Sequence, residues 1–231
     1  MSEPAIAARR VSKFFGDFPA IRSVDLSASA GEVLALLGRN GAGKTTLLRM
    51  LAGLTRPSSG EIRVAGAADP QEVARRIGVL GHGVWLYEDL TAAENLRFFG
   101  ALYQVAELEA RISFWLEQTG LARFEKARLS EFSRGMRQRL AVARAFLHDP
   151  DVLLLDEPWT ALDDRAVRFL SDQIADARRR GRTVVVCSHQ LREALETADR
   201  IAVLDRGRLV FTGPNSPELQ AAPERLYERI S

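Results

Sequence analysis

The strongest chemical signal in the sequence is a glycine-rich run that ends in lysine and threonine. Residues 38–45 read GRNGAGKT and follow an apolar run at 33–37. Glycines let the backbone curl so that successive N–H groups face one point, and a following helix adds positive potential there. The run therefore predicts a phosphate-binding loop, in which Lys44 reaches the outer phosphates and the Thr45 hydroxyl helps to bind Mg²⁺. An incidental glycine-rich turn is disfavoured by the strand–loop–helix context. The residues expected at the phosphates are Gly38, Arg39, Asn40, Gly41, Ala42, Gly43, Lys44, Thr45 and Thr46.

Two adjacent acids, Asp156 and Glu157, follow the apolar run at 152–155. Carboxylates at the end of a buried strand are costly unless they bind something positive. We expect Asp156 to hold Mg²⁺ and Glu157 to act as general base on the water that attacks the γ-phosphate. The alternative is a solvated strand end followed by a helix cap at Asp163 or Asp164.

Histidines mark two further strand ends. His189 follows the run at 183–187 and is expected to hydrogen-bond the γ-phosphate. His82 follows the run at 77–80, whereas His148 is expected only to cap a helix C-terminus. Since ligands bind at the carboxyl ends of strands in open parallel sheets, all these strand ends are predicted to meet at one edge.

The elements that must position these residues alternate between short strands and longer helices along the chain. Short apolar runs separated by helical stretches predict a mainly parallel sheet with helices on both faces. Short β segments in the first 30 residues and at 60–64 predict an antiparallel flap, and residues 200–213 a hairpin. Residues 84–135 predict an aromatic-rich helical insertion, so that residues 1–231 form one domain.

Composition narrows the class of protein. The 231 residues are 46% hydrophobic and carry a net charge of +2, so no strong field favours nucleic acid as a partner. The single cysteine, Cys187, excludes an intramolecular disulfide and a cysteine-based zinc site. No apolar stretch approaches the roughly 18–20 residues that cross a bilayer. A cytosolic chain is expected, unless a partner holds it at a membrane.

A second anion-binding site is predicted at the start of the helical stretch 132–147, FSRGMRQRLAVARAFL. Ser133 caps this helix, and the N–H groups after it are open to an anion. One nucleotide cannot easily occupy two helix N-termini almost a hundred residues apart in one chain. The sequence therefore predicts a homodimer that holds ATP between two copies.

The ordered motifs together resemble the ATPase subunit of an ABC transporter over essentially the whole chain. They are GRNGAGKTT (38–46), FSRGMRQR (132–139), VLLLDEP (152–158), TALD (160–163) and CSHQ (187–190). The resemblance implies a P-loop ABC-type α/β fold with a RecA-like sheet, an antiparallel β flap and an inserted helical subdomain. It implies ATP and Mg²⁺ as cofactors and integral membrane transporter subunits as partners. It also implies a peripheral location on the cytoplasmic face of the inner membrane.

The same resemblance assigns further site residues. Phe15 would stack on adenine, and Asp163 would communicate between the two sites of the dimer. The signature departs from the common L-S-G-G-Q form, because Phe132, Arg134 and Met136 replace Leu, the first Gly and Gln. The residues expected to contact the second ATP are Ser133, Arg134, Gly135 and Met136.

His82 occupies the position where this family normally has glutamine, which contacts Mg²⁺ or water. A neutral imidazole offers one donor and one acceptor, so it partly replaces an amide. The LGH variant, LTAAENLRFF (90–99) and EPWTALD (157–163) resemble the haem-exporter ATPase of cytochrome c maturation. The expected function is thus an ATPase that powers export by membrane subunits, in haem export. The alternatives are an exporter of lipid, drug or polysaccharide, a soluble ABC ATPase and, least of all, a nucleotide kinase.

Overall fold

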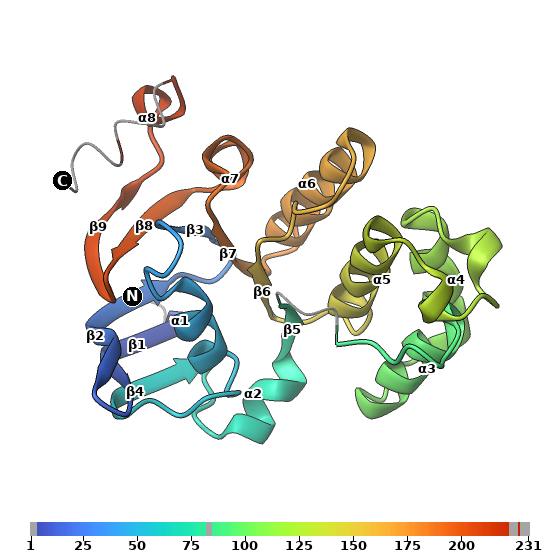
Figure 1. The fold of residues 1–231 in the computed structure, drawn as a ribbon, viewed down its shortest axis with the longest axis horizontal. Helices are drawn as coiled ribbons and strands as arrows, with labels where there is room; N and C mark the ends of the chain where they lie inside the picture. Colours follow the sequence, from blue (N-terminus) through green and yellow to red (C-terminus); the bar gives the residue numbers. More distant parts are fainter. Residues whose placement is uncertain (1–3, 82–84, 222–225, 227–231) are drawn as a thin grey trace.

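A six-stranded sheet forms the centre of the molecule, with strand order β5-β6-β7-β3-β8-β9 (Figure 1). This computed structural model describes residues 4–81, 85–221 and 226. The five strands from β5 to β8 are parallel neighbours, and β9 pairs with β8 as an antiparallel hairpin. The predicted mainly parallel sheet and the hairpin are therefore confirmed. The strands are β3 (Val33–Leu37), β5 (Ile77–Leu80), β6 (Val152–Asp156), β7 (Thr183–Ser188), β8 (Arg200–Asp205) and β9 (Arg208–Pro214).

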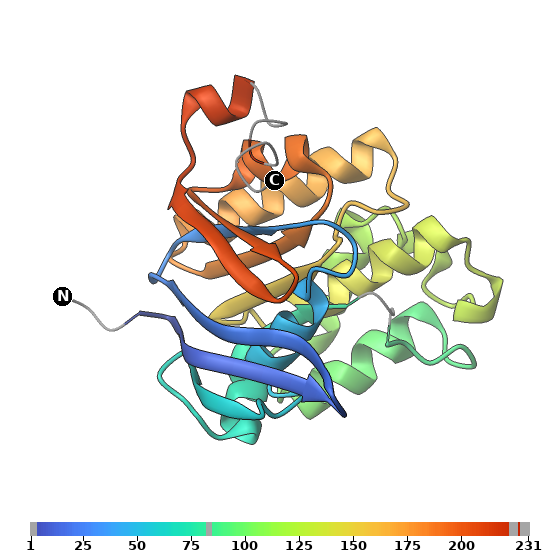
Figure 2. The same cartoon turned by 60° about the vertical axis from the view of Figure 1, so that its left-hand side comes forward.

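A second, antiparallel sheet has the strand order β2-β1-β4 and confirms the predicted flap (Figure 2). Its strands are β1 (Ile6–Phe15), β2 (Phe18–Ala28) and β4 (Ser59–Val64). The prediction of short segments was wrong for β1 and β2, which have ten and eleven residues. Their length lets the turn between β1 and β2 reach the ligand-binding edge of the central sheet.

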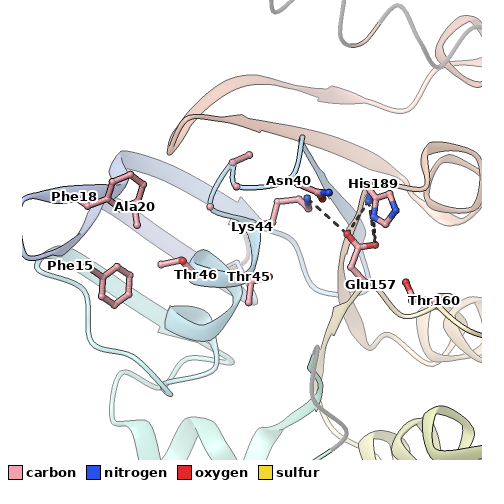
Figure 3. A pocket seen from close by; sticks show the side chains of 13 residues that line it. Phe15, Phe18, Ala20, Asn40, Lys44, Thr45, Thr46, Glu157, Thr160 and His189 are labelled. Carbon is pink, nitrogen blue, oxygen red and sulfur yellow. Dashed lines mark hydrogen bonds and ion pairs between the residues drawn. The ribbon is translucent and has the colours of Figure 1, made fainter. Parts of the chain in front are cut away.

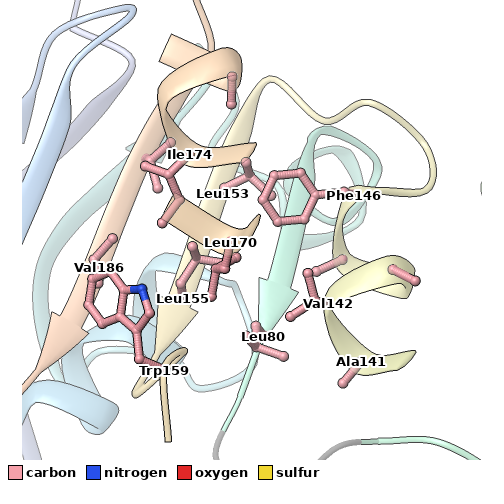
Figure 4. Packing of buried hydrophobic residues seen from close by; sticks show 14 of the residues in the cluster. Leu80, Ala141, Val142, Phe146, Leu153, Leu155, Trp159, Leu170, Ile174 and Val186 are labelled. Carbon is pink, nitrogen blue, oxygen red and sulfur yellow. The ribbon is translucent and has the colours of Figure 1, made fainter. Parts of the chain in front are cut away.

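Both faces of the central sheet are buried, which explains why its strands read as unbroken apolar runs. Val33, Ala35 and Leu37 of β3 belong to one cluster, whereas Leu34 and Leu36 belong to the other. Helices α5 and α6 cover the first face (Figure 4) and α1, with the flap, covers the second. The helices are α1 (Lys44–Leu51), α2 (Pro70–Arg76), α3 (Ala92–Leu102), α4 (Leu108–Gln118), α5 (Arg134–Phe146), α6 (Asp164–Arg179), α7 (Leu191–Thr197) and α8 (Pro217–Ala221).

Helices α3 and α4 stand beside α5, away from the flap (Figure 1). A capping box between Thr91 and Glu94 begins α3. The fully buried Asn95 fixes the preceding turn, since its Oδ1 accepts from Tyr87 N and its Nδ2 donates to three carbonyls, including that of Tyr87. Helix α5 then runs from this lobe back to the sheet. No helix of the described ranges is long and apolar enough to span a bilayer.

The role predicted for His148 was wrong, because its imidazole does not cap α5. The ring stacks on Tyr103 with 3.8 Å between ring centroids, and its Nε2 donates to the carbonyl oxygen of Ile77 at 3.0 Å. His148 therefore joins β5 to the carboxyl end of α3. Burial lowers the pKa of His148 from 6.5 to about 4, so the imidazole is neutral at physiological pH.

The close approach of β5 to α5 predicts that Gly78→Ala destabilises the fold. A methyl group at Gly78 would overlap the carbonyl oxygen of Ala145, which is backbone and cannot move aside. We expect a loss of about 1–3 kcal/mol in the free energy of unfolding, measured by urea denaturation. Gly100→Ala is the control, because its methyl would meet only a flexible end of Leu108. Equal midpoints for the two variants would contradict this prediction.

The neutral His148 predicts a loss of stability in acid. Below pH 6.5 the unfolded chain binds a proton at this residue, whereas the folded chain does so only near pH 4. Stability therefore falls as the pH falls through this window, by about 2 kcal/mol from this group. His148→Gln should remove that part of the pH dependence in urea unfolding measured between pH 7 and 4.5. An unchanged slope would show that the pKa of His148 is the same in the folded and unfolded chain, and would contradict its lowering by burial.

Candidate nucleotide site

A cavity of about 500 Å³ opens at the carboxyl edge of β3, β6 and β7 (Figure 3). It unites three of the four predicted strand ends, since the phosphate-loop residues, Glu157 and His189 line one space. His82, predicted at the fourth strand end, lies outside the described residues. The lining residues are Phe15, Phe18, Ala20, Asn40, Gly41, Ala42, Gly43, Lys44, Thr45, Thr46, Glu157, Thr160 and His189.

The glycine-rich loop adopts a conformation that only glycine tolerates at Gly43. This residue is the N-cap of α1 with φ of 108°, and a Cβ there would lie 2.7 Å from the carbonyl oxygen of Ala20. The loop thus packs tightly on β2, and its backbone N–H groups lie just before the N-terminus of α1. This is the geometry that binds phosphate.

Lys44 and Glu157 face one another across the cavity. The Lys44 side chain is only 7% exposed, and its Nζ donates to the carbonyl oxygen of Gly38 at 2.8 Å. The same Nζ lies 3.9 Å from Glu157 Oε1. A cation and an acid are therefore held in one poorly hydrated space, where electrostatic interactions are strong.

Thr45 and Asp156 bring two oxygen ligands together beneath the loop. Thr45 Oγ1 donates to Asp156 Oδ2 at 2.8 Å, and Asp156 is 2% exposed. A hydroxyl and a carboxylate are the oxygen donors that Mg²⁺ prefers, and it usually takes its other ligands from phosphate and water. The residues present therefore fit a magnesium ion bound together with a nucleotide.

Glu157 is held in a strained backbone conformation by its neighbours. Its φ is 50°, a left-handed value that costs a residue other than glycine on the order of 1–3 kcal/mol. Its N–H donates to Cys187 O, and its carboxylate accepts from Ser188 Oγ at 3.2 Å and the N–H of His189 at 3.1 Å. His189 Nδ1 lies 2.8 Å from the same carboxylate. Ser188 was missed, because nothing in its local sequence points to Glu157.

Cys187 is a buried structural thiol beneath this edge. It is level with Asp156 in the pairing of β6 with β7. Complete burial and, to a lesser extent, the nearby Asp156 charge raise the pKa of the thiol well above its usual value. The protonated thiol therefore packs in the core and takes no part in the chemistry of the site.

Two aromatic rings stand at the outer side of the cavity. Phe15 is 55% exposed and Phe18 is 65% exposed, and both line the cavity. They are direct cross-strand partners on β1 and β2, on either side of a two-residue turn. Phe15 lies where a base could stack. Phe18 was not predicted from the sequence, although the Gly16–Asp17 turn places it opposite Phe15.

The predicted signature residues lie outside the cavity of this chain. Ser133 is the N-cap of α5, and its Oγ accepts from Met136 N at 3.2 Å, as expected. A Cβ at Gly135 would lie 3.2 Å from Ala161 O, so the start of α5 packs on the segment after β6. Asp163, in that segment, caps α6 by accepting from a backbone N–H.

Comparisons with known proteins agree with this geometry. Residues 21–160 match the sequence profile described as ABC transporter. The ABC transporter ATP-binding protein NatA of Bacillus subtilis (strain 168) is 41% identical over 215 residues, covering 90% of this chain and 84% of NatA. The chain belongs to the ABC transporter ATPase family. Another relative of this ABC ATPase is the Nod factor export ATP-binding protein I of Rhizobium meliloti (strain 1021), 40% identical over 214 residues, which cover 90% of this chain and 64% of the relative.

Solved structures show the same fold. An ATP-binding subunit of an ABC transporter superposes with a TM-score of 0.92 at 27% identity, covering 98% of this chain and all of that one. The ATP-binding cassette MJ0796, solved as a dimer in a post-hydrolysis state with ADP and Pi, gives 0.81 at 27% identity over 91% of this chain and 99% of that one. The chain is therefore an ATP-binding ABC transporter subunit and an ATPase with the P-loop ABC fold.

Proposed function

We propose that this ABC ATPase hydrolyses ATP at the carboxyl edge of β3, β6 and β7 to power export by separate membrane subunits. One observation carries the proposal: a cation and a catalytic acid, Lys44 and Glu157, share a cavity with the phosphate loop. The Thr45–Asp156 pair beneath that loop fits Mg²⁺, which would neutralise charge on the phosphates.

The burial and position of these residues support their proposed roles. Glu157 acts as general base, because its carboxylate is 12% exposed and is aimed by Ser188 and His189. His189 is half exposed beside it and hydrogen-bonds the γ-phosphate. Lys44 binds the outer phosphates, and Phe15 stacks on adenine.

We propose that two copies of the chain enclose each ATP. Ser133, Arg134, Gly135 and Met136 lie outside the cavity of their own chain and are available to the nucleotide of a second copy. Asp163 communicates between the sites, since it caps α6 and lies in the segment after β6 that packs on the start of α5. The dimer of MJ0796 supports this arrangement.

The proposed partners are integral membrane subunits that dock on the helical insertion. We propose that residues 1–231 act as one nucleotide-binding domain, in which this insertion spans about residues 84–135. Residue 84 lies outside the described residues. Trp85, Tyr87, Phe98 and Leu102 expose between 40% and 64% of their surface on this lobe. These residues provide an apolar docking surface. The protein would then lie peripherally on the cytoplasmic face of the inner membrane, with no nucleic acid partner.

Haem export is our finer proposal for the cargo, and it rests on short motifs. Trp159 of EPWTALD is 2% exposed in the core, so packing accounts for its aromatic ring. Asn95 of LTAAENLRFF likewise fixes a turn. The haem proposal therefore depends mainly on His82, whereas the names of two relatives, both Nod factor export proteins, support an exporter without naming haem.

Glu157→Gln should abolish turnover and keep ATP binding, because an amide retains the shape of the carboxylate and cannot take a proton. With ATP, this variant should elute from gel filtration as a dimer. A monomeric Glu157→Gln variant with unchanged hydrolysis would contradict both the general base and the dimer.

Lys44→Ala should lose most ATPase activity through weaker phosphate binding.

A cellular test separates haem export from other cargo. Cells that carry only the Glu157→Gln allele should lose c-type cytochromes, detected by haem staining, if haem export is the function. Normal cytochromes would refute haem export, whereas the proposal of an exporter ATPase would be unaffected.

The His82→Gln variant should keep ATPase activity within about tenfold, a barrier change of roughly 1.4 kcal/mol.

A further inference from the structure

Three arginines line a polar cavity that is separate from the nucleotide site. This cavity of about 240 Å³ opens where the carboxyl end of α4, the first half of α5 and the beginning of α6 meet. No described residue lines both this cavity and the nucleotide cavity. Its arginines come from three segments: Arg123 from the short turn Ala122–Phe124, Arg139 from α5 and Arg165 from α6.

Arg139 is oriented by the end of α4. Its Nη1 donates to the carbonyl oxygen of Thr119 at 3.0 Å. A Cβ at Gly120 would lie 3.2 Å from the same nitrogen, so glycine leaves room for the guanidinium. A guanidinium has several N–H donors, and this one makes no second hydrogen bond within the described ranges. Arg139 is therefore held in place and keeps donors for a ligand.

The other two guanidiniums have no acceptor from the described part of the chain. Arg123 lies beside an aromatic ring, with 5.1 Å between its guanidinium carbon and the ring centroid of Phe124. Arg165 is exposed in the first turn of α6, and its side chain makes no hydrogen bond within residues 4–81 and 85–221. By contrast, Arg178 and Arg180 at the other end of α6 each pair with an aspartate.

Two carboxylates also line the cavity and leave its positive charge in excess. Asp163 accepts a hydrogen bond from the N–H of Ala166, and Glu117 is exposed in the last turn of α4. Among the described residues, neither acid forms an ion pair with any of the three arginines. Like charges gathered in this way repel one another, and a bound anion would relieve that repulsion.

The size and the donor set of the cavity select a small oxyanion. Its volume is below the roughly 300–1,000 Å³ of pockets that enclose drug-sized ligands. Guanidiniums fork on the oxygens of phosphate, and Arg123, Arg139 and Arg165 approach from three different segments. An ion with several equivalent oxygens can accept from all three, whereas a single carboxylate has only two oxygens to share.

We propose that this cavity binds an inorganic phosphate ion, which joins the end of α4 to the start of α6. Thr160 lines the nucleotide cavity and Asp163 lines this one, so the segment between β6 and α6 connects the two. Phosphate is a product of ATP hydrolysis, and its binding here makes hydrolysis sensitive to phosphate. This effect on hydrolysis rests on the proposed function, whereas the binding itself does not.

Isothermal titration calorimetry with inorganic phosphate tests the site in the full-length chain. The nucleotide cavity is first saturated with β,γ-imido-ATP and Mg²⁺, so that phosphate cannot bind at the phosphate loop. We expect each wild-type chain to bind a further phosphate ion. Arg165→Gln should weaken this binding about tenfold, because it removes charge-assisted hydrogen bonds to the ion. The fold should persist, since the exposed Arg165 side chain has no hydrogen-bond partner in the described ranges.

Arg168→Gln is the matched control. Arg168 is exposed on the same helix and does not line the cavity, so this variant loses the same charge at a neighbouring position. It should bind phosphate as the wild type does. No further phosphate in the wild type, or equal weakening in the two variants, would overturn the proposal. Tighter binding of triglutamate than of phosphate would also overturn it, by assigning the cavity to an acidic protein segment.

ATPase assays at saturating ATP test the effect on hydrolysis. Added phosphate should change kcat in the wild type and in Arg168→Gln, but not in Arg165→Gln. A response that persists in Arg165→Gln would assign it to the nucleotide site and refute the coupling between the cavities. A wild-type chain without ATP hydrolysis would refute the proposed function instead, and calorimetry would still test the phosphate site.

Discussion

The site depends on the parallel pairing of β3, β7 and β6, which brings the ends of three buried strands to one edge. Leu37 is level with Ser188, and Asp156 is level with Cys187. Because every position of these strands is buried, a polar side chain is tolerated only where a strand ends. The same apolar faces that stabilise the sheet therefore bring Lys44 and Glu157 into one cavity, with Asp156 hydrogen-bonded to Thr45 beneath the loop.

Holding the charged side chains of that cavity in place costs free energy, and local contacts offset this cost. Glu157 takes a left-handed φ, and three groups from the end of β7 and beyond hold its carboxylate. Lys44 is fixed by the carbonyl of Gly38. Groups oriented in this way need little rearrangement during the reaction, which is a main source of catalysis in phosphoryl transfer.

The local motifs could be predicted from the sequence, whereas contacts between distant segments could not. The phosphate loop and the Asp156–Glu157 pair were found because each motif follows an apolar run directly. Ser188 and Phe18 were missed because their importance comes from the neighbouring strand or the cavity. The interpretation of His148 was wrong for the same reason: the sequence shows the end of α5 nearby but neither the ring of Tyr103 nor the carbonyl of Ile77.

Helix α5 links the features that remained separate in the sequence. It begins at the proposed contact with the second ATP, capped by Ser133, and carries Arg144 eleven residues later, about 16 Å along the axis. The helix is continuous from Arg134 to Phe146, and its last turn packs on β5, where Gly78 faces the carbonyl oxygen of Ala145. Closure of the proposed dimer and the position of the docking surface would then be coupled by one rigid element and not by a chain of loops.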